Sequence, residues 1–291
     1  MIHDARRENF RGGQMGERPK NLPDFKNPPL VEVALAVQFQ RIEEFRIYDI
    51  GPLWDQFREE FGIAQEHPPL DPAFETFGTK PEPQGPKIEL LSGPLPIPRL
   101  WFLNDAQTQL IQFQPDRFVL NWRKVKEGDS YPRYEQIKDR FVEELERLKR
   151  FLKDRGADRI SPNQCEITYV NHIVVDNDED LWAQPDKVFR FIGPEIKTET
   201  LGQPEDTHFQ VRFRLLSDED QPVGRLTAVA QPALSKEGGH MFMLTLMARG
   251  QPAKPTLEAA SEFIDMGREK IVHSFAELTS ETMHRRWGRS Q

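Results

Sequence analysis

The chain of 291 residues contains a single cysteine, Cys165, so no disulfide bond can form within it. Extracellular proteins often rely on disulfides, and we therefore expect a reducing, cytoplasmic location. No apolar signal-peptide core follows Met1, so we expect no secretion. No run of about 18 apolar residues is present either, and this predicts that the chain makes no membrane span.

Positive charge is also scarce, with 39 Lys and Arg against 47 Asp and Glu, for a net charge of −8. Because non-specific binding to nucleic acid is driven by positive charge, this balance disfavours a nucleic-acid partner. The common catalytic and phosphate-binding motifs are missing, including GxGxxG, HExxH, GxSxG and paired CxxC. The seven histidines show no metal-ligand spacing. We therefore predict no catalytic residue, no metal and no cofactor.

Periodic apolar residues are plentiful, and they predict an α+β protein. The order of a strand, a short helix, three or four antiparallel strands and a long helix occurs twice along the chain. The first half covers residues 27–160, with its long helix over 131–155, and the second half covers 161–291, with its long helix over 256–278. We expect two similar halves, each an antiparallel curved sheet packed on a long helix. The alternative is one α+β domain with a single larger sheet.

Two segments lack such periodicity. Residues 1–26 are polar and predict a disordered arm that offers no apolar stripe to bury. Residues 63–98 are rich in proline and predict a long connector, with one short strand at 87–91 inside it.

The predicted strand over residues 164–175 suggests one candidate site. Tyr169 and Asn171 share its apolar face, where a buried amide needs hydrogen-bond partners. Either these two side chains hold loop backbone in place, or they contact a ligand in a pocket between the sheet and a long helix.

The opposite, outward face of the predicted strands suggests a second candidate site. Parity places Arg123, His172, Arg212 and Arg214 on this face. Clustered guanidinium groups suit carboxylate or phosphate recognition, so these residues predict binding of an anionic ligand or an acidic partner. The alternative is an ordinary solvated sheet face.

Trp287, near the end of the sequence, has two interpretations. Its indole either packs back on the body of the protein or anchors a protein partner, since Trp is typical of interface hot spots.

Several strings give the chain a wider likeness. They are Asn27-Pro28-Pro29-Leu30-Val31-Glu32, Asn121-Trp122-Arg123-Lys124, Tyr131-Pro132-Arg133-Tyr134, Tyr169-Val170-Asn171, and an ending of Phe275-Ala276-Glu277-Leu278-Thr279 followed by Met283-His284-Arg285-Arg286-Trp287-Gly288. Through them the chain resembles a sporadically distributed family of uncharacterised bacterial proteins. The last long helix of that family often carries a His-Glu pair, where this chain has Gly267-Arg268-Glu269. The resemblance implies a bacterial cytosolic protein and no particular reaction.

These observations together favour a non-catalytic binding or adaptor protein with a protein partner or an anionic ligand. The alternative is a small-molecule-binding protein or hydrolase whose pocket lies between the sheet and a long helix, near Tyr169 and Asn171.

Overall fold

The computed structural model describes residues 22–78, 96–157, 160–174, 182, 184–193, 200, 205–236 and 238–290. Within these ranges the chain forms one open antiparallel sheet of nine strands together with four α-helices. The strands are β1 (Leu30–Phe39), β2 (Ile63–His67), β3 (Arg99–Leu103), β4 (Gln109–Gln114), β5 (Arg117–Arg123), β6 (Pro162–Val174), β7 (Phe209–Leu216), β8 (Pro222–Leu234) and β9 (His240–Gly250). The helices are α1 (Ile50–Asp55), α2 (Tyr134–Lys153), α3 (Leu257–Leu278) and α4 (Glu281–Trp287), with 3₁₀ turns η1 (Ile47–Asp49) and η2 (Pro185–Lys187).

The sheet is centred on β1 and β6. Its strand order is β2-β3-β4-β5-β1-β6-β9-β8-β7, so β1 and β6 are consecutive neighbours in the middle. The β1 sequence explains this position. Val33, Leu35 and Val37 form one face of β1 and are fully buried, whereas Ala34 and Ala36 on the other face are small. A strand with apolar or small residues on both faces is suited to the interior of a sheet.

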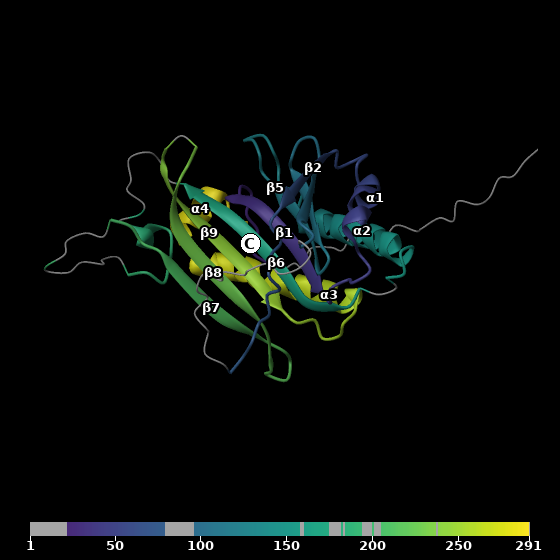
Figure 1. Cartoon of the computed structure of the whole chain (residues 1–291). Coiled ribbons are helices and arrows are strands. Elements are labelled where there is room, and N and C mark those ends of the chain that lie inside the picture. The colour runs from purple at the N-terminus through teal and green to yellow at the C-terminus, as the bar shows by residue number, and fades with distance from the viewer. Residues whose placement is uncertain are drawn as a thin grey trace, which may run out of the picture.

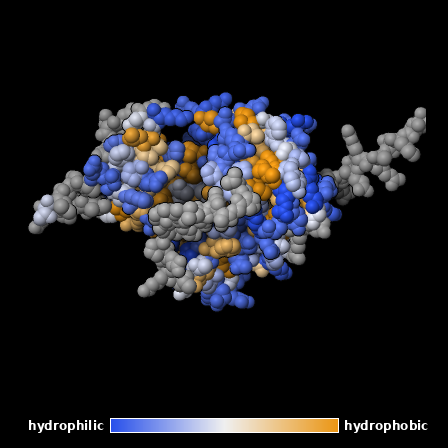
Figure 2. Space-filling model, in the orientation of Figure 1, coloured by the Kyte–Doolittle hydropathy of each residue, from blue (hydrophilic) through white to orange (hydrophobic). Residues whose placement is uncertain are grey.

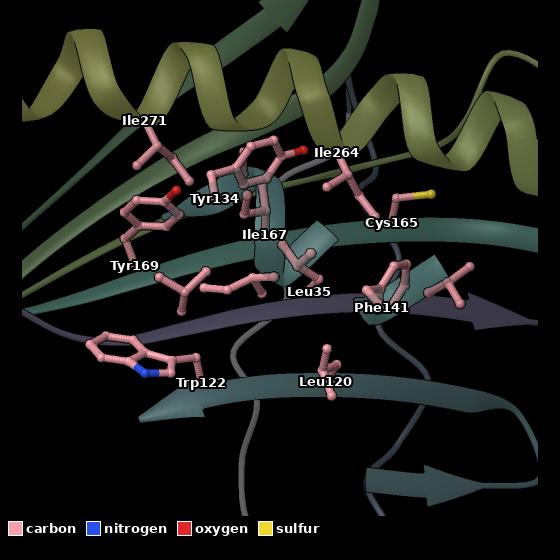
Figure 3. Close-up of a cluster of buried hydrophobic side chains, with 14 of the residues drawn as sticks. Leu35, Leu120, Trp122, Tyr134, Phe141, Cys165, Ile167, Tyr169, Ile264 and Ile271 are labelled. Atoms are coloured by element: carbon pink, nitrogen blue, oxygen red, sulfur yellow. The ribbon is translucent and has the colours of Figure 1, made fainter. Parts of the chain in front are cut away.

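The two long helices cover one face of the sheet, which we call the helix face. Helix α3 packs on β6 and β9, and α2 packs near β5; in Figure 1, α3 lies behind these strands. Figure 3 shows Ile264 and Ile271 of α3 pointing toward the sheet, where they meet Ile167 and other buried side chains. The opposite face is turned toward the viewer in Figure 1. It carries polar side chains of the central strands, including Glu32, Gln38 and Glu166, and we call it the polar face.

Ordered structure extends beyond the sequence-based boundaries in three places. Strand β2 lies inside the predicted connector, where it pairs with β3. Leu22 and Phe25, assigned to the arm, are buried. Helix α4 was not predicted; Ser280 caps it by accepting a hydrogen bond from the Met283 N–H. The rest of the predicted arm and the predicted strand at 87–91 lie outside the described residues.

The segment before β1 and helix α4 pack together. The Lys26 N–H donates to the Gly288 carbonyl at 3.1 Å, and the Asn27 N–H donates to the Trp287 carbonyl at 2.9 Å. Gly288 ends α4 with φ of 67°, a left-handed conformation that glycine adopts without steric penalty. Trp287 is only 5% exposed and stacks near Phe275 at 5.0 Å between ring centroids. The indole therefore packs on the body of the protein, and its interpretation as a free anchor for a partner is corrected.

The close approach of α3 to the sheet depends on Gly267. A Cβ at this position would lie 2.7 Å from the Ile167 Cγ2 atom of β6 and 3.1 Å from the Ala248 Cβ atom of β9. Real Cβ contacts are not this short, so any side chain here would push α3 away from the strands.

Gly267→Val should destabilise the protein by about 1–3 kcal/mol, the usual range for forcing extra volume into a packed core. The matched control is Glu269→Val, which places the same β-branched residue at an exposed position of α3 and should change stability by less than about 1 kcal/mol. Urea unfolding of both variants measures the difference. Equal stabilities for the two variants would contradict the close packing described here.

Candidate ligand-binding site

A cavity of about 340 Å³ lies on the helix face. The strands β6 and β9 form its floor, α3 forms one wall, and the residues before β1 and at the start of α2 complete it. Most of its lining is apolar. The apolar side chains include Phe25, Leu30, Leu246, Ile271, Val272 and Phe275.

Tyr169 and Asn171, the two residues predicted from strand parity, both line this cavity. The Tyr169 and Tyr131 hydroxyl oxygens lie 3.2 Å apart and share one hydrogen bond. The Asn171 Nδ2 donates to the Leu244 carbonyl of β9 at 3.2 Å, so its amide is partly committed to backbone. Figure 3 shows the Tyr169 side chain between the sheet and Ile271 of α3.

Arg268 is the charged residue of α3 that reaches this cavity. It is 7% exposed. Its Nη2 lies 3.3 Å from the Glu135 Oε1, and its guanidinium carbon lies 5.0 Å from the centre of the Tyr134 ring. Its Nε–H is buried and has no hydrogen-bond acceptor among the described residues. Leaving a buried donor without an acceptor costs about 1–3 kcal/mol of folding free energy. The Arg268 Nε–H therefore destabilises an otherwise well-packed wall.

The three tyrosines around Arg268 are held in their neutral form. Burial raises the pKa of Tyr131 and Tyr134 well above the usual value, and their hydrogen bonds to Tyr169 and Asp265 add to the shift. Burial also raises the pKa of Tyr169, although the neighbouring Tyr131 and Arg268 partly offset the effect. At neutral pH these phenols therefore act as hydrogen-bond donors and not as bases.

Eight residues of the described lining have polar side chains. They are Asp24, Arg133, Glu135, Asn171, Arg268 and the three tyrosines. Ser, Thr, Cys, Lys and His are absent from that described lining, whereas the carboxylates of Asp24 and Glu135 are part of it. Cys165 lies elsewhere in the core, where burial raises the pKa of its thiol to about 12.

The four residues of the cluster predicted from parity share one face of the sheet but do not lie together. The register of the sheet places Arg123, His172, Arg212 and Arg214 on one face, as predicted. However, Arg123 lies on β5, and Arg212 and Arg214 lie on β7, with β1, β6, β9 and β8 between them. Adjacent strands are about 4.8 Å apart, so five steps correspond to roughly 24 Å along the sheet. Parity fixes the face but not the strand order, and the predicted four-residue cluster is corrected to a dispersed set.

Sequence reasoning missed Tyr131, Tyr134 and Arg268 as site residues. A signal for Arg268 was present, because it lies four residues after Ile264 and three before Ile271 on the inner stripe of α3. A charged residue at a position that faces the core is unusual and indicates either a buried ion pair or a ligand. The sequence does not indicate that Tyr131 and Tyr134 lie beside Arg268, because the path of α2 over the sheet sets their position.

Comparisons of this chain with protein-family models, curated proteins and solved structures found no match. The family resemblance noted above therefore stays a prediction. None of the helices in the described ranges is both long and apolar enough to cross a membrane. Those ranges also contain no group of three or more His, Cys, Asp or Glu side chains placed to hold a metal ion.

The buried phenols predict how the protein responds to alkali. Three of its four tyrosines have raised pKa values in the folded state. The unfolded chain releases their protons near pH 10 while the folded protein keeps them, so stability should be full below about pH 10 and fall as the pH rises above it.

Ultraviolet titration measures this directly, because tyrosinate absorbs where tyrosine does not. Three of the four phenols should stay protonated until the protein unfolds. Tyr48→Phe identifies the contribution of the fourth tyrosine, which is 73% exposed. Reversible ionisation of all four in the native protein would show that the cavity tyrosines are open to water.

Proposed function

We propose that this protein is a non-catalytic binding protein whose helix-face cavity holds a small, mainly apolar molecule with one anionic or hydrogen-bond-accepting group. Arg268 carries this proposal, because its guanidinium is buried in the wall of an apolar cavity and its Nε–H has no acceptor among the described residues. Proteins rarely leave such a donor unpaired, and a ligand oxygen would satisfy it.

The hydroxyl groups of Tyr131 and Tyr169 also favour an anionic or hydrogen-bond-accepting group on the ligand. When one phenol donates to the other, the second phenol keeps one O–H for another acceptor. Tyr169, Tyr131 and Arg268 line the same cavity, and both tyrosines are neutral donors by the pKa directions given above. A carboxylate has two oxygens and can accept from the free phenol and from the guanidinium together.

The remainder of the cavity fits an apolar body. Phe25, Val272 and Phe275 contribute aromatic and aliphatic surface beside the polar groups. The cavity volume of about 340 Å³ is at the lower end of the range for small-molecule pockets, about 300–1,000 Å³. These dimensions favour a compact ligand such as a medium-chain or aromatic carboxylic acid.

We also infer an internal duplication, in which β1, β3, β4, β5 and α2 correspond to β6, β7, β8, β9 and α3. Under this correspondence the strand order from β3 to β7 reads the same from either edge of the sheet. The duplication would place the cavity beside the β1–β6 junction, where the two units meet. It would also explain why a cavity with a polar wall lies near the centre of the sheet.

Octanoate and octylammonium are suitable probes, because they share an apolar chain and differ in the charge of the head group. Octanoate should bind at least tenfold more tightly than octylammonium by isothermal calorimetry. Arg268→Gln should weaken octanoate binding by about tenfold or more, since a hydrogen bond to a charged group contributes about 1.5–3 kcal/mol. Tyr169→Phe should weaken it by a smaller factor.

The matched control is Lys270→Gln, which removes the same charge from an exposed position two residues further along α3. It should leave octanoate affinity unchanged. If Arg268→Gln alters the fold, Arg268→Lys keeps the charge and tests the guanidinium alone. Equal binding of the two probes, or equal effects of the two glutamine variants, would contradict the proposed function.

A further inference from the structure

The polar face of the sheet is crossed by residues 68–78, which we call the strap. Three glutamines, on β4, β1 and β6, hold the strap through hydrogen bonds between their side chains and its backbone. The strap N–H groups of Leu70, Ala73 and Glu75 donate to the Oε1 atoms of Gln114, Gln38 and Gln164 at 3.1, 2.8 and 3.4 Å. Gln114 also returns a bond from its Nε2 to the Leu70 carbonyl at 2.9 Å.

The far part of the strap is fixed by Arg225 of β8. Its guanidinium pairs with Glu75 and donates to the Thr76 carbonyl at 2.6 Å. It also lies 4.5 Å from the centre of the Phe77 ring. In Figure 1 the strap runs across the viewer's side of the sheet. Figure 2 shows the same side in space-filling form, with a hollow in its upper half.

A second cavity, of about 270 Å³, lies between this strap and the sheet. Its floor is made of small side chains, including Ala34, Ala36 and Thr168, which leave space above the central strands. Its walls carry three arginines and two glutamates. The helix-face cavity is on the opposite face of the sheet, so the two sites are separate.

The arginines of this wall differ in how their charges are balanced. Arg249 pairs with Glu166, with 2.7 Å between Nε and Oε2. By contrast, Arg99 and Arg117 have no carboxylate within ion-pair distance in the described ranges. The Arg117 Nη2 donates to the Gln38 Oε1 at 2.8 Å and to the Asp71 carbonyl at 3.1 Å. Both guanidinium groups are partly buried, and the carboxylates of Asp116 and Glu166 act on Arg117 only from beyond ion-pair distance. Two partly desolvated cations on one cavity wall repel each other, so this arrangement favours an anion between them.

Arg99 also carries a hydrogen-bond donor that the described residues do not satisfy. Its Nη1 donates to the Gln112 Oε1 at 3.2 Å, but its Nε–H is buried without an acceptor among the described residues. Burial lowers the pKa of both guanidiniums, and Arg117 lowers that of Arg99 further by repulsion. A bound negative charge would oppose this lowering, because an opposite charge nearby raises the pKa of a guanidinium.

A chain of hydrogen bonds fixes the orientation of the neighbouring amides. The Gln112 Nε2 donates to the Asn121 Oδ1 at 2.8 Å, and the Asn121 Nδ2 donates to the Glu32 Oε1 at 2.6 Å. Glu32 thus holds Asn121, Asn121 holds Gln112, and Gln112 turns its oxygen toward Arg99. The Arg99 side chain is therefore positioned before any ligand arrives, which reduces the entropy lost on binding.

We propose that the cavity under the strap is an oxyanion site, in which Arg99 and Arg117 together bind the carboxylate or phosphate group of a small molecule. Planar guanidinium groups can each give two parallel N–H bonds to such a group. The site lies beneath the strap and shares Arg117 with it, so a bound anion and the strap contact the same side chain.

Titration with succinate and with inorganic phosphate, each at constant ionic strength made up with chloride, tests the proposal and distinguishes the two sources of the oxyanion. At least one of the two should raise Tm by several degrees in a saturable manner, because a ligand that binds only the folded state stabilises it. Arg99→Gln and Arg117→Gln should each weaken that anion at least tenfold.

The matched control is Arg214→Gln, which removes the same charge from an exposed position on the same face and should leave the affinity unchanged. Without added anion, Arg99→Gln should keep or raise Tm, because it removes one of two repelling cations. A purely structural role for Arg99 predicts a lower Tm in that variant. If neither anion exceeds chloride, or if Arg99→Gln and Arg214→Gln behave alike, the oxyanion site is overturned. If Arg117→Gln does not fold, the anion affinity of Arg99→Gln alone decides the outcome.

Discussion

The antiparallel pairing of β1 with β6 is the contact on which the rest of the structure depends. It joins the strands β2–β5 to the strands β7–β9 in one sheet, and its register sets which side chains face each side. Val33 pairs with Tyr169 on the helix face, whereas Ala34 pairs with Thr168 on the polar face. Because side chains alternate along a strand, a shift of one residue would exchange the two faces and destroy both cavities.

The two faces of the sheet provide partners for their buried polar groups in different ways. On the helix face, apolar packing surrounds a small polar group built from Arg268, Glu135 and the tyrosines. On the polar face, glutamine and arginine side chains bind the backbone of the strap, whose Leu70 and Phe74 side chains are exposed. Four arginine Nε–H groups are buried without an acceptor among the described residues, those of Arg99, Arg123, Arg140 and Arg268. Of these four residues, Arg268 lines the helix-face cavity and Arg99 lines the cavity under the strap, where a ligand oxygen would satisfy the donor.

Local periodicity predicted the strands and the long helices well. The alternation over residues 30–39 gives β1 with its observed bounds, and parity alone placed Tyr169 and Asn171 on the apolar face that lines the helix-face cavity. These predictions succeeded because the period of two in a strand is a property of the local backbone.

The order of strands in the sheet could not be predicted from the sequence, because it depends on long-range pairing. Parity alone therefore groups Arg123 with Arg212, and the sequence does not indicate which residues surround Arg117. For the strap the sequence predicts only a proline-rich connector, since its hydrogen bonds go to glutamine side chains that are distant in sequence. The sequence does not indicate that Gln38 and Gln164 bind backbone, because an amide side chain on a strand is most often solvated.

The central claim is that the two faces hold two independent sites, each completed by a ligand oxygen that accepts from an arginine Nε–H. Proton–nitrogen correlation spectra of the arginine Nε–H groups test this most directly, with Arg268→Gln and Arg99→Gln identifying the two signals. The account predicts that octanoate shifts the Arg268 signal and leaves Arg99 unchanged, whereas the preferred small anion, succinate or phosphate, shifts Arg99 and leaves Arg268 unchanged. Shifts of both signals by one probe, or of neither signal by any probe, would contradict it.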